Sequence, residues 1–104
     1  MIIIMPPSTV VLREWNIIEL KDFGSRHFVG FSIYDKIGRV STPIQEFDDV
    51  AWEGVTESGS NYLFKGEPGL VHPDALYVLN RVAGYGRIKY EWVYPTPQNT
   101  DGLH

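Results

Sequence analysis

The feature that most constrains the fold is a series of strand-length apolar runs separated by short turns. Residues 9–20 are rich in Val, Ile and Trp, and two interleaved apolar sets within them predict partial burial of both faces. Residues 27–35 alternate apolar and mixed positions with a period of two, which is the pattern of a half-buried strand. Residues 21–26 contain Gly24-Ser25 and predict a turn between the two runs.

Later segments continue this pattern. Residues 39–47 predict a strand in which Pro43 belongs at a sheet edge or a bulge, because proline has no N–H to donate to a ladder. Residues 51–57 and 60–65 flank Ser58-Gly59 and predict a hairpin. Residues 88–94 alternate again, and the alternation places Ile88, Tyr90, Trp92 and Tyr94 on one face, opposite Lys89, Glu91 and Val93.

One segment is helical in its spacing. Leu76, Leu79 and Ala83 recur at helical intervals, Pro73 suits a first helical position, and Asp74 suits the positive end of the helix dipole. The sequence therefore predicts an α+β, mostly β fold. We expect five or six antiparallel strands, as a curled sheet or small barrel, with one late α-helix at about 73–83. Short links between successive strands favour antiparallel pairing, since parallel pairing needs long crossovers.

The length of 104 residues and the 43% hydrophobic content predict a single small domain, which we place at residues 1–94. Residues 95–104 are polar and contain prolines, which predicts a flexible C-terminal tail. We expect the apolar run Ile2-Ile3-Ile4 either to add a strand within the fold or to pair with a second copy, so a homodimer is one expected state. This run is too short for a membrane span, and we expect a cytoplasmic protein without a membrane partner.

Charge is distributed unevenly along the chain. The net charge is −4, which disfavours binding to duplex nucleic acid. No basic residue occurs between Arg39 and Lys65, whereas five acids and a tryptophan fall between residues 46 and 57. Because loops carry recognition more often than framework strands, we expect this acidic segment to bind a partner protein with a basic surface. The candidate partner-binding residues are Glu46, Asp48, Asp49, Trp52, Glu53 and Glu57.

Several chemistries find no support in the sequence. The absence of cysteine excludes disulfides, thiolate metal sites and cysteine nucleophiles. His72-Pro73-Asp74 supplies two metal-ligand types, but the position favours a helix cap for His72. No nucleophile elbow or phosphate-binding glycine motif occurs, and nothing selects one serine over another. We therefore predict no catalytic residues, no metal and no cofactor, and a chain that is not an enzyme.

Two polar segments leave alternatives open. Residues 56–62 bring hydroxyls, an amide and a phenol around one turn, which suits a small ligand but is also typical of turns. Residues 85–92 interleave bases with aromatic residues, the pattern that stacks on single-stranded nucleic acid. On a strand, however, Tyr90 and Trp92 share a face with Ile88 and belong to the core.

Three segments together carry a resemblance. Arg39-Val40-Ser41-Thr42-Pro43-Ile44, Gly54-Val55-Thr56-Glu57-Ser58-Gly59-Ser60-Asn61-Tyr62-Leu63 and Gly66-Glu67-Pro68-Gly69 look like small uncharacterised β-rich proteins of proteobacteria and their phages or mobile elements. The resemblance covers the middle third of the chain. It implies a small cytoplasmic accessory protein, and proteins of that kind often act by binding, including as inhibitors of bacterial defence systems.

These observations favour a non-enzymatic protein-binding module. The specific expectation is a phage or mobile-element protein that inhibits a defence or nuclease complex of its host. Three tryptophans and six tyrosines provide interface anchors. The alternative is a single-stranded nucleic-acid or nucleotide binder that uses the sheet face and residues 85–92.

Overall fold

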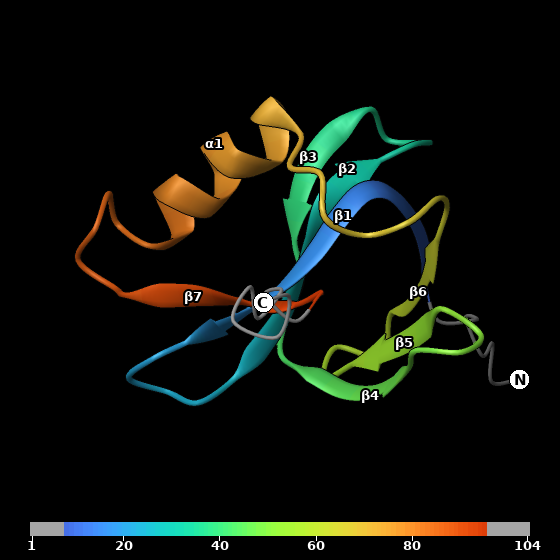
Figure 1. The fold of residues 1–104 in the computed structure, drawn as a ribbon, viewed down its shortest axis with the longest axis horizontal. Helices are drawn as coiled ribbons and strands as arrows, with labels where there is room; N and C mark the ends of the chain where they lie inside the picture. Colours follow the sequence, from blue (N-terminus) through green and yellow to red (C-terminus); the bar gives the residue numbers. More distant parts are fainter. Residues whose placement is uncertain (1–7, 96–104) are drawn as a thin grey trace, which may run out of the picture.

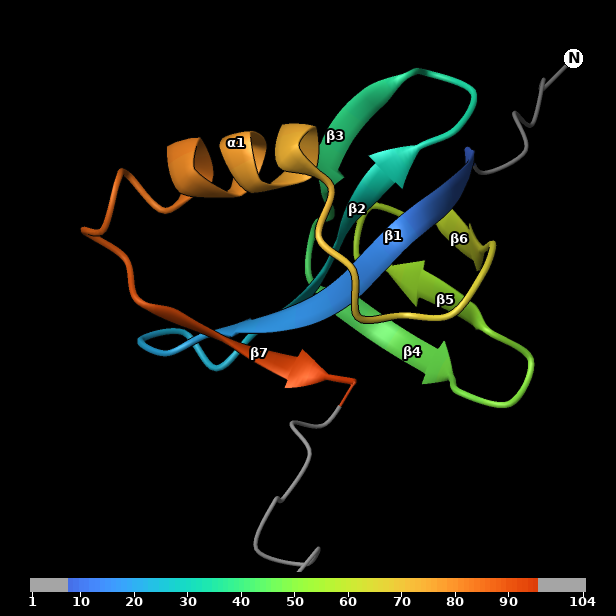
Figure 2. The same cartoon turned by 45° about the horizontal axis from the view of Figure 1, so that its top comes forward.

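The computed structural model describes residues 8–95, which form seven strands and one helix (Figure 1, Figure 2). The elements are β1 Thr9–Leu20, β2 Arg26–Ser32, β3 Ile37–Val40, β4 Ile44–Asp48, β5 Glu53–Thr56, β6 Asn61–Phe64, α1 Pro73–Val82 and β7 Tyr90–Tyr94. The Ile2-Ile3-Ile4 run and residues 96–104 of the expected tail lie outside the described residues. Within residues 8–95, no helix combines the length and the apolar character needed to cross a membrane.

β1 lies at the centre of the sheet because it pairs with three strands. β2 runs antiparallel along one side of it. On the other side, β6 pairs in parallel with the first part of β1, and β7 pairs antiparallel with the last part. β3 extends the sheet beyond β2, whereas β5 and β4 extend it beyond β6. Two meanders, β1–β2–β3 and β4–β5–β6, are thus joined through the β1–β6 pair.

This topology confirms a mostly β fold with one late helix and corrects the details. The sheet has seven strands with mixed pairing, so the prediction of five or six antiparallel strands is wrong. The argument from short links holds for consecutive strands such as β4 and β5. It fails for β1 and β6, because the chain between them, residues 21–60, is long enough to act as the crossover.

A bulge in β1 decides which of its side chains enter the core. Arg13 pairs with Phe31 and Asn16 with Val29, so Glu14 and Trp15 together stand opposite Gly30. Glu14 has a φ of 47°, and a Cβ added at Gly30 would lie 3.0 Å from the Trp15 Cβ. The extra residue shifts the alternation, which brings Trp15 to the same buried cluster as Leu12. The bulge thus lies in β1, directly opposite the mid-strand glycine of β2.

The predicted strand 39–47 is divided into β3 and β4. Ser41 still follows the β2 ladder, since its N–H donates to the Phe28 carbonyl (2.9 Å) and its Oγ accepts from the Phe28 N–H (2.8 Å). Pro43 comes next and cannot donate, but its carbonyl accepts from the Glu57 N–H (2.8 Å). The chain therefore passes from one meander to the other at Thr42-Pro43, and a single strand over these residues is wrong.

The core consists of two clusters on opposite faces of β1. One lies between β1 and the β4–β6 meander, and its buried members are Val10, Leu12, Trp15, Ile17, Phe28 and Tyr62. The other lies under the helix, and its buried members are Ile18, Leu20, Val29, Ala75 and Leu79. Figure 1 shows α1 covering the face of β2 and β3 away from the β4–β6 meander. Both interleaved apolar sets of residues 9–20 are buried for this reason.

The helix docks closely because Gly38 has no side chain. A Cβ at Gly38 would lie 2.2 Å from the carbonyl oxygen of Asp74 in the first turn of α1. The start of the helix is capped by His72, whose Nδ1 accepts from the Asp74 N–H (3.0 Å). The predicted cap and the predicted helix are both confirmed.

β7 departs from simple alternation. Its pairing with β1 shifts between Ile17 and Ile18, which leaves Val93 without a partner in the register. Tyr90 and Trp92 pack with Ile88 against one core cluster, as predicted, and this cluster lies under the helix. Tyr94 packs against the other cluster. The expectation that Tyr94 shares a face with Trp92 is wrong, because the irregularity after Trp92 reverses the alternation.

Candidate interaction surface

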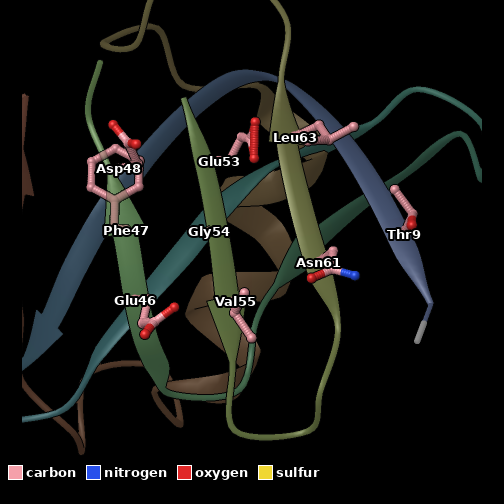
Figure 3. A pocket seen from close by; sticks show the side chains of 9 residues that line it. All are labelled: Thr9, Glu46, Phe47, Asp48, Glu53, Gly54, Val55, Asn61 and Leu63. Carbon is pink, nitrogen blue, oxygen red and sulfur yellow. The ribbon is translucent and has the colours of Figure 1, made fainter. Parts of the chain in front are cut away.

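Three acids of the predicted binding segment meet on the outer face of the β4–β6 meander. Asp48 stands directly opposite Glu53 in the β4–β5 ladder, and Glu46 stands opposite Val55. Phe47, between the two acids of β4, packs into the core cluster on the inner face. Figure 3 shows Glu46, Asp48 and Glu53 on the same side of the two strands. Period-two alternation thus places these carboxylates together.

The outer face is hollowed into a depression of about 540 Å³. It is lined by Thr9, Glu46, Phe47, Asp48, Glu53, Gly54, Val55, Asn61 and Leu63. The ladders explain this composition, because Glu53 pairs with Leu63 and Val55 with Asn61, which in turn pairs with Thr9. Sequence reasoning did not place Thr9, Asn61 and Leu63 beside the acids, since only the cross-strand register brings these residues together.

Asp48 also shapes the β4–β5 turn. Its Oδ1 accepts hydrogen bonds from the N–H groups of Ala51 (3.0 Å) and Val50 (2.8 Å). These bonds to the charged form hold the pKa of Asp48 below its ordinary value. The ionised carboxylate therefore holds the backbone of the β4–β5 turn through these two hydrogen bonds.

The acidic segment has no cationic partner in the described part of the chain. The ion pairs within residues 8–95 all lie elsewhere, for example Lys21–Glu91 (2.8 Å) and Arg26–Glu19 (3.1 Å). Asp48 and Glu53 stand opposite each other across the ladder, so two negative charges lie on the same face. The net negative charge of this face is available to an external cation.

The other predicted contact residues lie away from the depression. Asp49 is exposed in the β4–β5 turn, and Glu57 is exposed in the β5–β6 turn. Trp52 is partly buried and makes an edge-to-face contact with Trp15, with ring centroids 5.9 Å apart. Its ring therefore packs against the core rather than standing free among the acids, which weakens its candidacy as an anchor.

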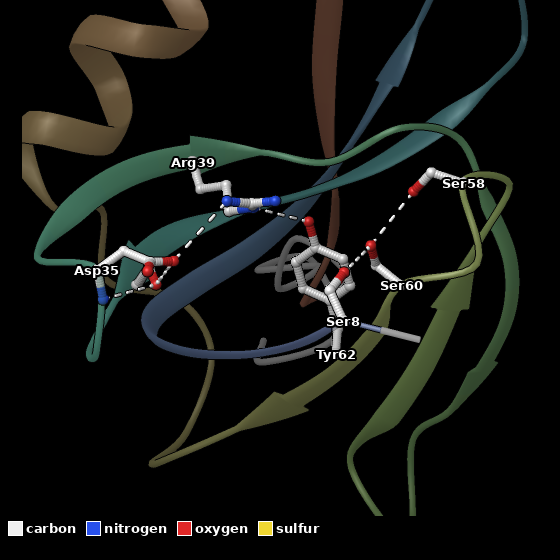
Figure 4. Close-up of polar contacts among 7 residues, drawn as sticks. Ser8, Asp35, Arg39, Ser58, Ser60 and Tyr62 are labelled. Carbon is white, nitrogen blue, oxygen red and sulfur yellow. Dashed lines mark hydrogen bonds and ion pairs between the residues drawn. The ribbon is translucent and has the colours of Figure 1, made fainter. Parts of the chain in front are cut away.

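The polar turn at 56–62 uses its hydroxyls internally. Ser60 Oγ lies 2.7 Å from Ser8 Oγ and 3.3 Å from Ser58 Oγ (Figure 4). Tyr62 is buried, and its hydroxyl accepts from Arg39 Nε (3.1 Å). These contacts explain why the turn is polar without a bound ligand.

Residues 85–92 offer only part of the predicted nucleic-acid surface. Tyr85 is 74% exposed, and Arg87 and Lys89 are exposed as well. Tyr90 and Trp92 are partly buried against the cluster under the helix and pack edge to face, with centroids 5.7 Å apart. In the region from residue 8 to residue 95, no group of three or more acidic or histidine side chains is arranged to hold a metal ion.

In comparisons with known proteins, no family model, curated protein or solved structure matches this chain.

Proposed function

We propose that this chain is a protein-binding module that engages a basic partner through the outer face of β4, β5 and β6. The observation that carries the proposal is the Asp48–Glu53 pair, with Glu46 beside it, in a depression without a cation from the described residues. Lysine or arginine side chains of a partner would be attracted to the negative charge of this face. Val55 and the 40%-exposed Leu63 add apolar contact area to the same face.

The experiment compares charge reversal on this face with the same reversal elsewhere. Partners are captured from a host lysate with wild-type protein, and association rates are measured at low and high salt. Glu46→Lys with Glu53→Lys removes two carboxylates that shape no turn. We expect association at low salt to slow about tenfold or more and to lose most of its salt dependence.

A matched variant isolates the position of the charge. Asp22→Lys with Glu67→Lys changes the net charge equally but reverses exposed acids outside the depression. We expect wild-type association apart from a small uniform effect. Equal rates for the two double variants would contradict the proposal.

The more specific expectations stay predictions. These are a host defence or nuclease complex as the partner, a homodimer, and single-stranded nucleic acid as the alternative ligand. A mobility-shift assay with single-stranded oligonucleotides, using Tyr85→Ala and Arg87→Ala as variants, tests the alternative directly.

A further inference from the structure

One serine of the described chain differs from the others in its contacts. Ser25 Oγ lies 2.8 Å from Nε2 of His27. The hydroxyls of Ser8 and Ser58 both contact the hydroxyl of Ser60, and Ser32 donates to Asp35 (3.0 Å). Among the serine hydroxyls of residues 8–95, only that of Ser25 therefore has an imidazole within hydrogen-bond reach.

The imidazole is held in one orientation. His27 is buried, with 8% of its surface exposed, and its Nδ1 lies 2.8 Å from the backbone carbonyl oxygen of Ser41. A carbonyl only accepts, so the neutral ring carries its proton on Nδ1 and leaves Nε2 as an acceptor. The Ser25 hydroxyl must then donate to Nε2. Ser41 is itself fixed, because its Oγ accepts from the Phe28 N–H.

This is the relation of a nucleophile, a base and an orienting acceptor that activates serine in acyl-transfer sites. Here a backbone carbonyl takes the place of the usual carboxylate. Ser25 is partly exposed and lines a depression of about 380 Å³. His27 pairs with Ile18 on the other face of the sheet and is not part of this lining, so it acts on a bound molecule only through Ser25. Four of the other lining residues are apolar, namely Ile17, Pro43, Ile44 and Phe47. Arg26 also lines the depression, and its guanidinium is paired with Glu19 (3.1 Å).

We propose that Ser25 is an activated nucleophile toward carboxylic esters. Ser25 Oγ bonds to the acyl carbon while its proton passes to His27 Nε2. The alcohol then leaves with that proton as the C–O bond breaks. A water molecule, deprotonated by His27, attacks the acyl-serine, and the carboxylic acid leaves as the Ser25 hydroxyl is restored.

The absence of cysteine in the chain permits a direct test of activation. Ser25→Cys and, as a matched control, Ser58→Cys each introduce a single thiol, and iodoacetamide alkylation is timed at neutral pH. We expect the Cys at position 25 to react about tenfold faster, because an adjacent imidazole favours the thiolate. Adding His27→Gln should remove the difference. If that double variant does not fold, the two single-thiol rates still decide the outcome.

The native protein supplies the second measurement. A fluorophosphonate is incubated with the wild-type chain, and the modified peptide is identified by mass spectrometry. We expect an adduct on Ser25 that is lost in Ser25→Ala and retained in Ser58→Ala. Equal alkylation rates of the two thiols, no adduct, or adducts spread evenly over the serines would each overturn the proposal. These results do not depend on the acidic face, so the two proposals fail separately.

Discussion

At the scale of single residues, the fold depends on where side chains are absent as much as on where they are present. Gly38 and Gly54 have no φ in the left-handed region, yet each lies against another element with no room for a methyl group. Nothing in the neighbouring sequence indicates that either position must be glycine. The packing partner in each case is distant along the chain, so only the folded structure shows the constraint.

Gly54→Ala should destabilise the protein, because the new Cβ would lie 2.3 Å from Phe28 Cζ. We expect a loss of about 1–3 kcal/mol in the free energy of unfolding, the usual cost of overpacking. Urea denaturation followed by tryptophan fluorescence measures it. Phe28→Leu makes room for the methyl group, so the double variant should lose less than the sum of the two single losses. Additive losses would show that the contact is not the cause.

Asp48 should titrate below the ordinary aspartate pKa of about 3.9. The folded-state pKa is lowered, so the stability that this carboxylate contributes is complete above the ordinary value. It is lost as the pH falls through the lower folded value. Carboxyl ¹³C NMR of the folded protein measures the midpoint, and Asp48→Asn identifies the resonance. A midpoint at or above the ordinary value would contradict the hydrogen-bonded turn.

At the scale of elements, the helix is positioned by its first turn. His72 caps α1 through Nδ1 and stacks on Phe31 of β2, with ring centroids 4.2 Å apart. The cap follows from the residue types at 72–74, and sequence reasoning predicted it. The stacking partner follows from the docking of α1 on the sheet.

Substitution at His72 separates the two roles. His72→Ala should cost about 1 kcal/mol or somewhat more, because the cap and the ring contact are both lost. His72→Asn restores a capping side chain and should recover most of the cap contribution. Thermal denaturation of the three proteins measures this order. Equal destabilisation by Ala and Asn would assign the effect to the ring contact alone.

At the scale of the whole molecule, Trp15 joins parts of the chain that are far apart in sequence. It stacks on Phe64 (4.0 Å) and Tyr94 (5.6 Å), and its Nε1 donates to the Gly66 carbonyl (3.0 Å). The ends of β6 and β7 therefore meet at one ring that the β1 bulge turns inward.

Trp15→Ala should cost about 3–5 kcal/mol, a large part of the 5–15 kcal/mol that stabilises a typical domain. Trp52→Ala removes a tryptophan from the edge of the same cluster and should cost less, since that ring is only partly buried. Guanidinium denaturation monitored by circular dichroism compares them. Similar losses for the two variants would contradict a central role for Trp15.

Local sequence determined the elements that depend on local chemistry. The strand 9–20, the hairpin at Ser58-Gly59 and the capped helix follow from alternation, turn residues and capping residues within each segment. The acids of the candidate surface were likewise visible as a run. The β1–β6 parallel pair, the reversal after Trp92 and the inward Trp52 follow from register and burial between distant segments. For the same reason, Thr9 and Leu63 joined the acidic face, and Ser25 met His27 against the Ser41 carbonyl, only in the tertiary structure. Hydrogen-bond registry and close packing between remote segments carry no signal in any single stretch of sequence.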